Sequence, residues 1–265
     1  MTKKVSRDYK KILDSSTLKS GYKDEMKKLN KEKVDADNPR LLQMIREHFI
    51  VPPSNLPYNL AEINKRDTSM GQAAFVDNRL GYKKEGFFVE SGAHDGEYLS
   101  NTLFFERYRN WTGVLIEPLS KSFQKLRLKR RKAYIINACL SVHPYPSKEY
   151  MTTTPVIGGI VKNNAKQKFK QEQIVEVQCF PLYSILLALN RTNVDFLSLD
   201  VEGVELGVLN TVPWRNVNIT MMSIEFDKWP GGSESLCMYM KRRGYTCGMT
   251  MFAAGAADVL FQKRN

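Results

Sequence analysis

The chain has 265 residues, of which 42% are hydrophobic and 11% aromatic, and 40 Lys and Arg outnumber 28 Asp and Glu. This composition excludes a chain that is disordered throughout, and the length fits one large domain with an extension. The net charge of +12 favours anionic partners such as phosphates, acidic glycans, nucleic acid or a membrane surface. It is also typical of a protein with a solvated, lysine-rich surface.

Residues 1–37 are rich in lysine, and we expect a basic, partly helical extension able to touch an anionic membrane, followed by one domain over 38–265. The N-terminus lacks the apolar stretch of an ordinary signal peptide. No run of about 18 apolar residues occurs, so we expect no membrane span.

Two helices are predicted before the first strand. One begins near Pro39 and ends before Pro52, and the next runs over 70–80. From Phe87 onward strands alternate with helices, which predicts a doubly wound α/β fold with a seven-stranded, mostly parallel sheet and a C-terminal antiparallel hairpin. The predicted strands of this sheet cover 87–91, 112–117, 133–141, 194–200, 219–226, 245–251 and 257–264, and a further short strand is predicted over 174–180. The intervening helices are predicted over 100–109, 120–131, 182–190, 204–212 and 233–244.

Cysteines and glycosylation sequons give weaker signals. No C-x-x-C pair is present, so we expect no zinc or other metal site. Cys139 and Cys179 lie in apolar strand-like runs and are expected to pack as small hydrophobic side chains. Spacing leaves open whether Cys237 and Cys247 are bridged. Sequons stand at three positions, each just before a predicted strand, which places them in surface loops: Asn110, Asn190 and Asn218.

Acidic residues stand where three predicted parallel strands end: Glu90, Glu117 and Asp200. Ligands bind outside these carboxyl ends in such sheets. The loop after Glu90 reads G-x-x-x-G, with Gly92 and Gly96, rather than the G-x-G-x-x-G of a dinucleotide site. An acid there would repel a pyrophosphate, so a cationic, phosphate-free nucleoside such as S-adenosylmethionine fits better. Glu117 could then accept both ribose hydroxyls. Alternatively, the acids are satisfied by nearby backbone N–H groups.

The stretches "FFVESGAHDGEYLSNTLFFE", "WTGVLIEP", "NACLS" and "VDFLSLDVEGVELGVL" resemble the FkbM-type methyltransferase domain, and within it the arthropod Star family, over 67–263. The resemblance implies a class I methyltransferase fold that binds S-adenosylmethionine. The residues implied in cofactor binding are Glu90, Ser91, Gly92, Ala93, Gly96, Glu117, Cys139, Leu140 and Asp200, with Cys139 and Leu140 bordering the adenine.

Candidate catalytic residues are Asp200, Glu202 and His94, because an oxygen acceptor needs a general base within hydrogen-bond reach; Glu225 is a weaker candidate. His94 is alternatively a loop histidine that only packs, and Glu205 is expected to be helical and structural. The sequence therefore predicts an O-methyltransferase with an unidentified acceptor.

Two departures from the family favour an alternative. Glu90 replaces the usual Asp, and "CFPLYSIL" replaces a short "L-D" element. Star-like proteins are associated with export of membrane-bound growth-factor precursors from the endoplasmic reticulum. The resemblance thus also implies a non-catalytic module that binds a client membrane protein in the endoplasmic reticulum, Golgi and endosomes, as opposed to a cytoplasmic enzyme. Nucleic-acid binding through the basic run 126–132 is a third hypothesis; a solvated helix face explains that run better, so nucleic acid is not an expected partner.

Overall fold

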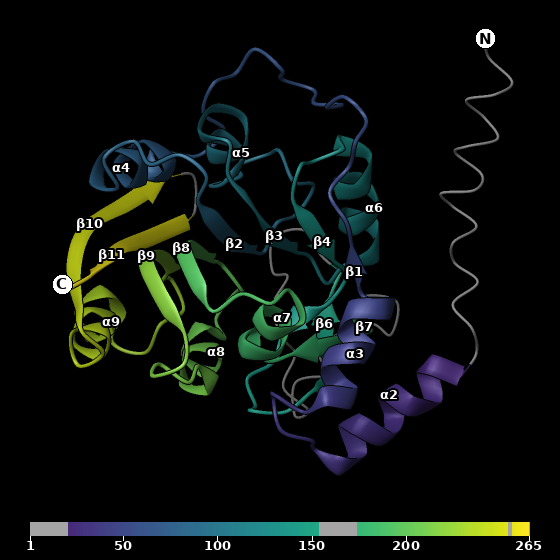
Figure 1. The fold of residues 1–265 in the computed structure, drawn as a ribbon. Helices are drawn as coiled ribbons and strands as arrows, with labels where there is room; N and C mark the ends of the chain where they lie inside the picture. Colours follow the sequence, from purple (N-terminus) through teal and green to yellow (C-terminus); the bar gives the residue numbers. More distant parts are fainter. Residues whose placement is uncertain (1–20, 154–173, 254–255, 265) are drawn as a thin grey trace, which may run out of the picture.

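The computed structural model describes residues 21–153, 174–253 and 256–264 (Figure 1). Within these residues the main sheet has eight strands, in the order β1-β4-β3-β2-β8-β9-β11-β10. Its parallel strands are β2 (Phe87–Ser91), β3 (Thr112–Ile116), β4 (Tyr134–Ile136), β8 (Asn193–Leu199) and β9 (Asn218–Glu225). Its antiparallel strands are β1 (Ile50–Val51), β10 (Tyr245–Ala253) and β11 (Ala256–Lys263). The order reverses between β2 and β8, which creates a switch point there.

Helices cover both faces of this sheet (Figure 1). One face carries α4 (Gln72–Arg79), α5 (Leu103–Arg109) and α6 (Ser120–Lys129). The other carries α3 (Pro39–His48), α7 (Leu182–Ala188), α8 (Glu205–Thr211) and α9 (Gly232–Lys241). This is the class I methyltransferase-like fold, with the predicted C-terminal hairpin.

Strand periodicity explains why both faces are apolar. In β2, Phe87 and Val89 enter the core on the α3 and α7 side, while Phe88 between them enters the core on the α4 to α6 side. All five residues of β2 are buried. A strand buried on both faces reads as a continuous apolar run, which is why these strands were predictable.

A second, smaller sheet departs from the prediction. It contains β5 (Cys139–Leu140), β7 (Ile174–Phe180) and β6 (Ser147–Thr152), in that order. The predicted strand over 133–141 therefore splits into β4 and β5, which belong to different sheets. Cys139 and Cys179 are buried among apolar side chains, as expected, but they are also disulfide-bonded to each other, which the sequence did not indicate. The reason is that pairing of β5 with β7 sets these two residues opposite each other.

Some boundaries also differ. The long polar segment 143–172 predicts an irregular loop, but β6 lies within it, and residues 154–173 lie outside the described part. The two-residue strand β1, which pairs with the edge of β4, was not predicted. Helix α5 begins at Leu103, whose N–H donates to the Ser100 hydroxyl at 3.2 Å, so Ser100 does support the helix start.

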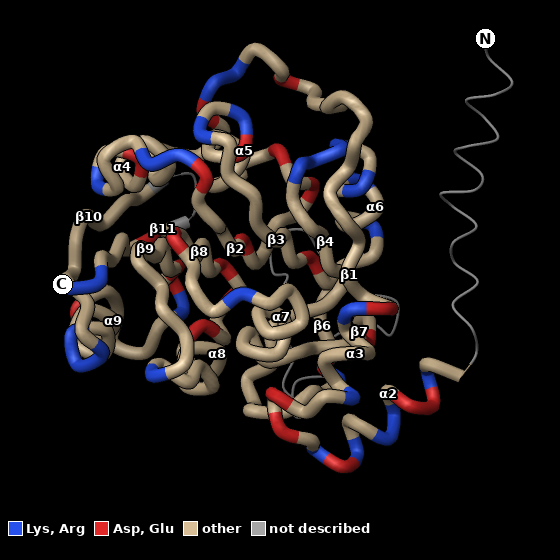
Figure 2. Tube along the Cα trace, viewed as in Figure 1, with Lys and Arg blue, Asp and Glu red and all other residues tan. Residues whose placement is uncertain are grey.

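The described part of the N-terminal extension is the helix α2 (Gly21–Glu32). Met26 and Leu29 are buried in the same core as the sheet, while acidic and basic positions alternate along the rest of the helix (Figure 2). Residues 1–20, for which membrane contact was expected, lie outside the described residues. Among the helices that the structure describes, none has the length and apolarity needed to cross a membrane.

The three sequon asparagines are exposed, as predicted. Asn110 ends α5 before β3, Asn190 precedes β8, and Asn218 is the first residue of β9. They therefore lie at the amino ends of the parallel strands, away from the switch point where these strands end.

A second disulfide joins Cys237 of α9 to Cys247 of β10. We predict that replacing both cysteines of a pair with alanine destabilises the domain, because each bridge restricts the unfolded chain. The expected loss is about 4 kcal/mol for the Cys139–Cys179 pair, whose sequence separation is 40, and about 3 kcal/mol for Cys237–Cys247, whose separation is 10. Denaturant unfolding of the two double variants measures both losses. Intact mass showing four free thiols in the oxidised wild type would contradict the pairing.

Candidate functional site

Backbone hydrogen bonds join three strand ends at the switch point. The Asp200 N–H donates to the Ser91 carbonyl at 3.2 Å, which ties the end of β8 to β2. The N–H groups of Gly92 and Ala93 donate to the Ile116 carbonyl at 3.1 and 3.2 Å, which ties the same loop to β3. Ser91 and Ala93 are both buried. The loop after β2 thus lies across the ends of its two neighbouring strands.

Gly92 and Gly96 have the positive φ angles +87° and +78°. A Cβ at Gly92 would lie 2.1 Å from the Asp200 carbonyl oxygen, and one at Gly96 would lie 2.2 Å from a methyl group of Leu126. The close approach that these glycines allow is therefore to the chain itself. They let the loop close tightly over the sheet, and substitution of either would force it open.

The buried carboxylate of Glu90 stabilises this loop through hydrogen bonds. It is 4% exposed, and its carboxylate accepts the Ser100 hydroxyl at 2.9 Å, the Asn101 N–H at 2.8 Å and the Thr102 hydroxyl. Burial raises its pKa, while Arg131 and the three donors oppose that rise. Glu90 is thus satisfied by protein donors, which is the alternative that the sequence left open, and it positions the residues that lead into α5.

Arg131 lies at the centre of the same network. Its Nε donates to Glu106 at 3.0 Å, and both side chains are fully buried. Its Nη atoms donate to the Gly96 carbonyl and to the hydroxyls of Ser100 and Thr102. The basic run 126–132 was expected to be a solvated helix face, and for Arg131 this is wrong. The spacing of the Lys and Arg residues in the sequence does not show which of their side chains is buried.

A second buried acid, Glu97, joins the loop to the segment around Ala61 and to α6. It is 3% exposed and accepts the N–H groups of Ala61 and Glu62 at 2.8 and 2.7 Å and the Lys129 ammonium at 2.5 Å. Burial opposes ionisation, but Lys129 and the two N–H groups hold the pKa of Glu97 below its usual value. Glu97 and Glu106 were not singled out by the sequence, although Glu97 directly follows Gly96.

Glu117 follows β3 and faces the loop after β2. Its Oε2 accepts the His94 N–H and its Oε1 the Leu119 N–H, both at 2.8 Å. Burial raises its pKa to about 7 against these two hydrogen bonds, and Asp200 adds to the rise. Each oxygen keeps a second lone pair. Glu117 can therefore accept two hydroxyl groups in addition to its present donors.

His94 and Glu202 differ from the buried acids in being accessible. The His94 side chain is 54% exposed, and its backbone is left-handed with φ 49°. Glu202 is left-handed as well, with φ 61°, and forms an ion pair with Lys228. Strained residues of this kind gather at functional sites, and both stand on loops at the carboxyl end of the sheet.

Asp200 and Glu225 end neighbouring strands β8 and β9. Burial, first of all, raises the pKa of both carboxyl groups, and their negative neighbours contribute to the rise. Glu205, at the start of α8 as expected, accepts the N–H groups of Val201 and Gly203 at 3.0 and 3.1 Å. Acidic positions accordingly gather inside the body of the molecule near β8, β9 and β11 (Figure 2).

The two residues expected beside the adenine lie in the second sheet. Leu140 is 1% exposed within the core, and the sulfur of Cys139 is bonded to Cys179. The first residue after β4 is Asn137, whose Nδ2 donates to the carbonyls of Glu117 and Pro118 at 2.8 and 3.0 Å. Asn137 therefore holds the end of β3 in place, a role that the sequence did not indicate.

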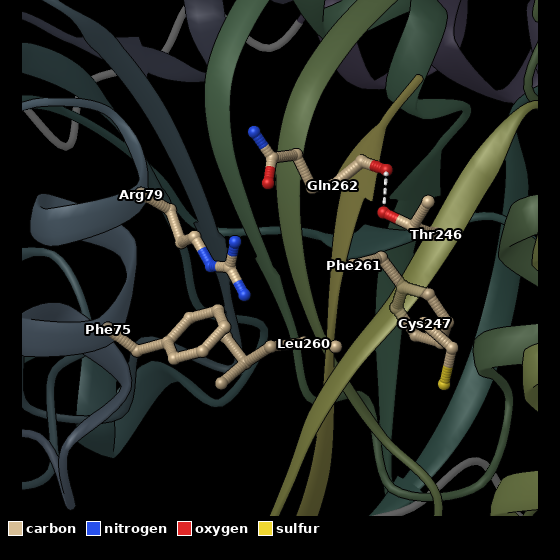
Figure 3. A pocket seen from close by; sticks show the side chains of 8 residues that line it. Phe75, Arg79, Thr246, Cys247, Leu260, Phe261 and Gln262 are labelled. Atoms are coloured by element: carbon tan, nitrogen blue, oxygen red, sulfur yellow. Dashed lines mark hydrogen bonds between the residues drawn. The ribbon is translucent and has the colours of Figure 1, made fainter.

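A cavity of about 260 Å³ lies elsewhere, between α4 and the β10–β11 hairpin. Figure 3 shows Phe75 and Arg79 from α4 facing Thr246, Leu260 and Gln262 from the hairpin. None of the strand-end acids lines it. We therefore place the candidate site at the strand ends on chemical grounds rather than at this cavity.

The strand-end residues fit S-adenosylmethionine by their chemistry. The cofactor carries ribose hydroxyls, an ammonium and a sulfonium. Glu117 offers acceptor oxygens for hydroxyls. Burial and negative neighbours raise the pKa values of Asp200 and Glu225, so a positively charged ligand group would stabilise their ionised forms. A cationic, phosphate-free nucleoside is the ligand class that matches both features.

Comparison with known proteins gives a family and a fold. The sequence model described as "Methyltransferase FkbM domain" matches residues 90–247, more than half of the chain. No curated protein matches at the level of sequence.

Among similar solved structures are two small-molecule methyltransferases and a ribosomal protein methylase. The 1,6-didemethyltoxoflavin-N1-methyltransferase of Burkholderia thailandensis, with S-adenosylhomocysteine bound, is 10% identical, with 76% of this chain and 80% of that chain covered and a TM-score of 0.37. The precorrin-6y C5,15-methyltransferase of Geobacter metallireducens is 9% identical, with 73% and 87% covered and a TM-score of 0.38. The ribosomal protein L11 methylase of Lactobacillus delbrueckii is 7% identical, with 74% and 79% covered and a TM-score of 0.40. At these values the likeness says nothing about substrate.

We predict that Arg131→Met destabilises the domain by about 3–5 kcal/mol, because Glu90 and Glu106 are left buried without their cation. Lys125→Met, on the exposed side of α6, is the matched control and is expected to stay within about 0.5 kcal/mol of the wild type. Urea unfolding measures both. The double variant Arg131→Met/Glu106→Gln should recover part of the loss, since one unpaired charge is removed; a double variant no more stable than Arg131→Met would contradict this account.

Proposed function

Because the chain belongs to the FkbM methyltransferase family, we propose that it binds S-adenosylmethionine at the carboxyl ends of β2, β3 and β8 and transfers the methyl group to an oxygen acceptor. The observation that carries this proposal is Glu117. Its carboxylate is buried, held by two N–H groups, and still has a free lone pair on each oxygen at the switch point of the sheet.

In this proposal the loop over 91–96 and Glu117 hold the nucleoside, with Glu117 accepting the ribose hydroxyls. Cys139 and Leu140 follow β4 in the chain and are proposed to border the adenine. Asp200 faces the positively charged methionine part. The bound cofactor supplies a methyl group on a sulfonium, and positioning of the acceptor does most of the work in such a transfer.

An oxygen acceptor must lose a proton during the reaction. The pKa of Asp200 is raised by burial and by Glu202 to about 7, so this carboxyl group can exchange a proton near neutral pH. Glu202, whose charge acts on Asp200, and His94, on the loop after β2, are accessible groups and are proposed to contact the acceptor.

A Star-like, non-catalytic module is the second candidate function. Glu90 and Gly92, which the family resemblance implies in cofactor binding, are engaged by contacts within the chain. Two disulfides and three exposed sequons fit a protein of an oxidising compartment such as the lumen of the endoplasmic reticulum. In this case the domain would bind a client membrane protein and would not bind the cofactor.

Calorimetric titration with S-adenosylhomocysteine separates the two candidates. We predict micromolar binding by the wild type and binding that is weaker by about tenfold or more in Glu117→Gln, because the amide replaces one acceptor oxygen with a donor. Glu85→Gln, an exposed acid before β2, is the matched control and should bind as the wild type does. Absence of binding by the folded wild type would reject the enzyme and leave the client-binding module.

The affinity for S-adenosylhomocysteine is also predicted to depend on pH. Since the pKa of Glu117 is raised to about 7, the carboxyl group is mostly protonated at pH 6 and mostly ionised at pH 8. The ionised form is the better acceptor of ribose hydroxyls, so affinity should rise about tenfold from pH 6 to pH 8. The Glu117→Gln variant should lose the part of this dependence that Glu117 contributes and keep the part that comes from Asp200, whose pKa is also raised to about 7. An affinity that falls with rising pH would contradict the role of Glu117.

A further inference from the structure

Three carboxylates converge behind the proposed cofactor site. Asp200 follows β8, Glu205 begins α8, and Glu225 ends β9. One carboxylate oxygen from each lies within 4.8 Å of the other two. Glu205 and Glu225 are 2% and 6% exposed, and Asp200 is half-buried. We propose that this trio binds a hard divalent cation, Mg²⁺, Mn²⁺ or Ca²⁺.

The state of Glu225 is the independent sign that a ligand belongs here. Among the described residues, no hydrogen-bond donor reaches its buried Oε2 atom. Its neighbour across the sheet is Asp258, another acid, whose own carboxylate is taken by Gln72 and Ser223. A buried carboxylate oxygen without a donor is strongly unfavourable, so a positive ligand or a shared proton must balance it.

The charge of Lys228 acts on Glu205 and Glu225, but this cation is also paired with a fourth acid. Lys228 forms its ion pair with Glu202, and both side chains are partly exposed, at 43% and 34%. The single charge of Lys228 is therefore shared between Glu202 and the buried acids. Asp200 and Glu225 hydrogen-bond to each other, so without a ligand this pair shares a proton, which a divalent ion would replace.

Backbone N–H groups of the loop before α8 fix the orientation of the Glu205 carboxylate. Glu202 and Gly203 are both left-handed, so the chain turns back and the N–H groups of Val201 and Gly203 reach the Glu205 Oε1 atom. A Cβ at Gly203 would meet the Lys228 side chain at 2.8 Å, which keeps this turn tight. One oxygen of Glu205 is thus fixed, and such second contacts orient ligands at metal sites.

The donor set selects the class of ion. It contains only carboxylate oxygens, which suit Mg²⁺, Mn²⁺ and Ca²⁺ rather than the softer ions that thiolates bind. Oxygen atoms on opposite sides of a Ca²⁺ ion, each at about 2.3–2.6 Å from it, lie about 5 Å apart, so a spread of 4.8 Å can surround one ion without movement of the backbone. The lack of C-x-x-C pairs says nothing about a site of this kind, because its carboxylates come from the ends of two strands and the start of a helix.

The test uses the whole, oxidised chain, freed of metal with a chelator and without any cofactor. Mn²⁺ is titrated and followed by electron paramagnetic resonance, and Mg²⁺ and Ca²⁺ are tested as competitors. We expect one Mn²⁺ per chain, a rise in melting temperature, and an affinity at least about tenfold weaker in Glu225→Gln. Asp227→Asn, an exposed acid two residues further along, is the matched control and should bind as the wild type does.

Several outcomes would overturn the proposal. The first is that the wild type shows no saturable binding at millimolar Mn²⁺, and the second is that Glu225→Gln binds Mn²⁺ as tightly as the wild type. The third is that S-adenosylhomocysteine displaces Mn²⁺, which would assign the three carboxylates to the ammonium of the cofactor. The melting temperature of Glu225→Gln in chelator shows whether the variant folds; if it does not, Glu205→Gln replaces it. Mn²⁺ binding is tested without cofactor, so the two proposals can fail separately. A protein that binds S-adenosylhomocysteine but not Mn²⁺ would keep the proposed function and reject the metal site. A protein that binds Mn²⁺ but not S-adenosylhomocysteine would keep the metal site and reject the proposed function.

Discussion

The buried pair of Arg131 and Glu106 is the interaction on which the rest of the site depends. A guanidinium without water must use its donors within the protein, and here they reach the Gly96 carbonyl and the hydroxyls of Ser100 and Thr102. Those hydroxyls in turn donate to Glu90. One cation therefore fixes both ends of the loop after β2, and this loop carries His94 over Glu117. The geometry at the switch point is set before any ligand arrives, as a binding site requires.

Much of the fold could be predicted from the sequence, because strands buried on both faces read as apolar runs and end at acids. The positions of Glu90, Glu117 and Asp200 followed directly from this. Their partners did not, since each lies far along the chain: Arg131 is 41 residues after Glu90, and its basic run looks the same whether it faces solvent or core. The Cys139–Cys179 bridge was missed for a related reason, because it depends on β5 leaving the main sheet to pair with β7. A two-residue strand such as β1 carries no periodicity to detect.

The two ends of the sheet differ in chemistry. At the amino ends of the strands stand the exposed sequon residues Asn110, Asn190 and Asn218, where bulky additions would disturb nothing. At the carboxyl ends stand acids, although the chain as a whole has a net charge of +12. A basic surface around an acidic centre draws anionic molecules toward the protein but admits cationic groups to its interior. This contrast suits a cofactor with a positive reacting centre better than a nucleotide with phosphates.

The order of β9, β11 and β10 in the sheet differs from their order of synthesis. The strand β10 leaves the ribosome first, yet its place is beyond β11, which pairs with β9 on one side and β10 on the other. Until β11 emerges, the edge of β9 stays open and Asp258 is missing from its contacts with Gln72 and Ser223. The nascent domain therefore carries an unpaired strand edge that attracts other chains, and chaperones would need to shield it during translation.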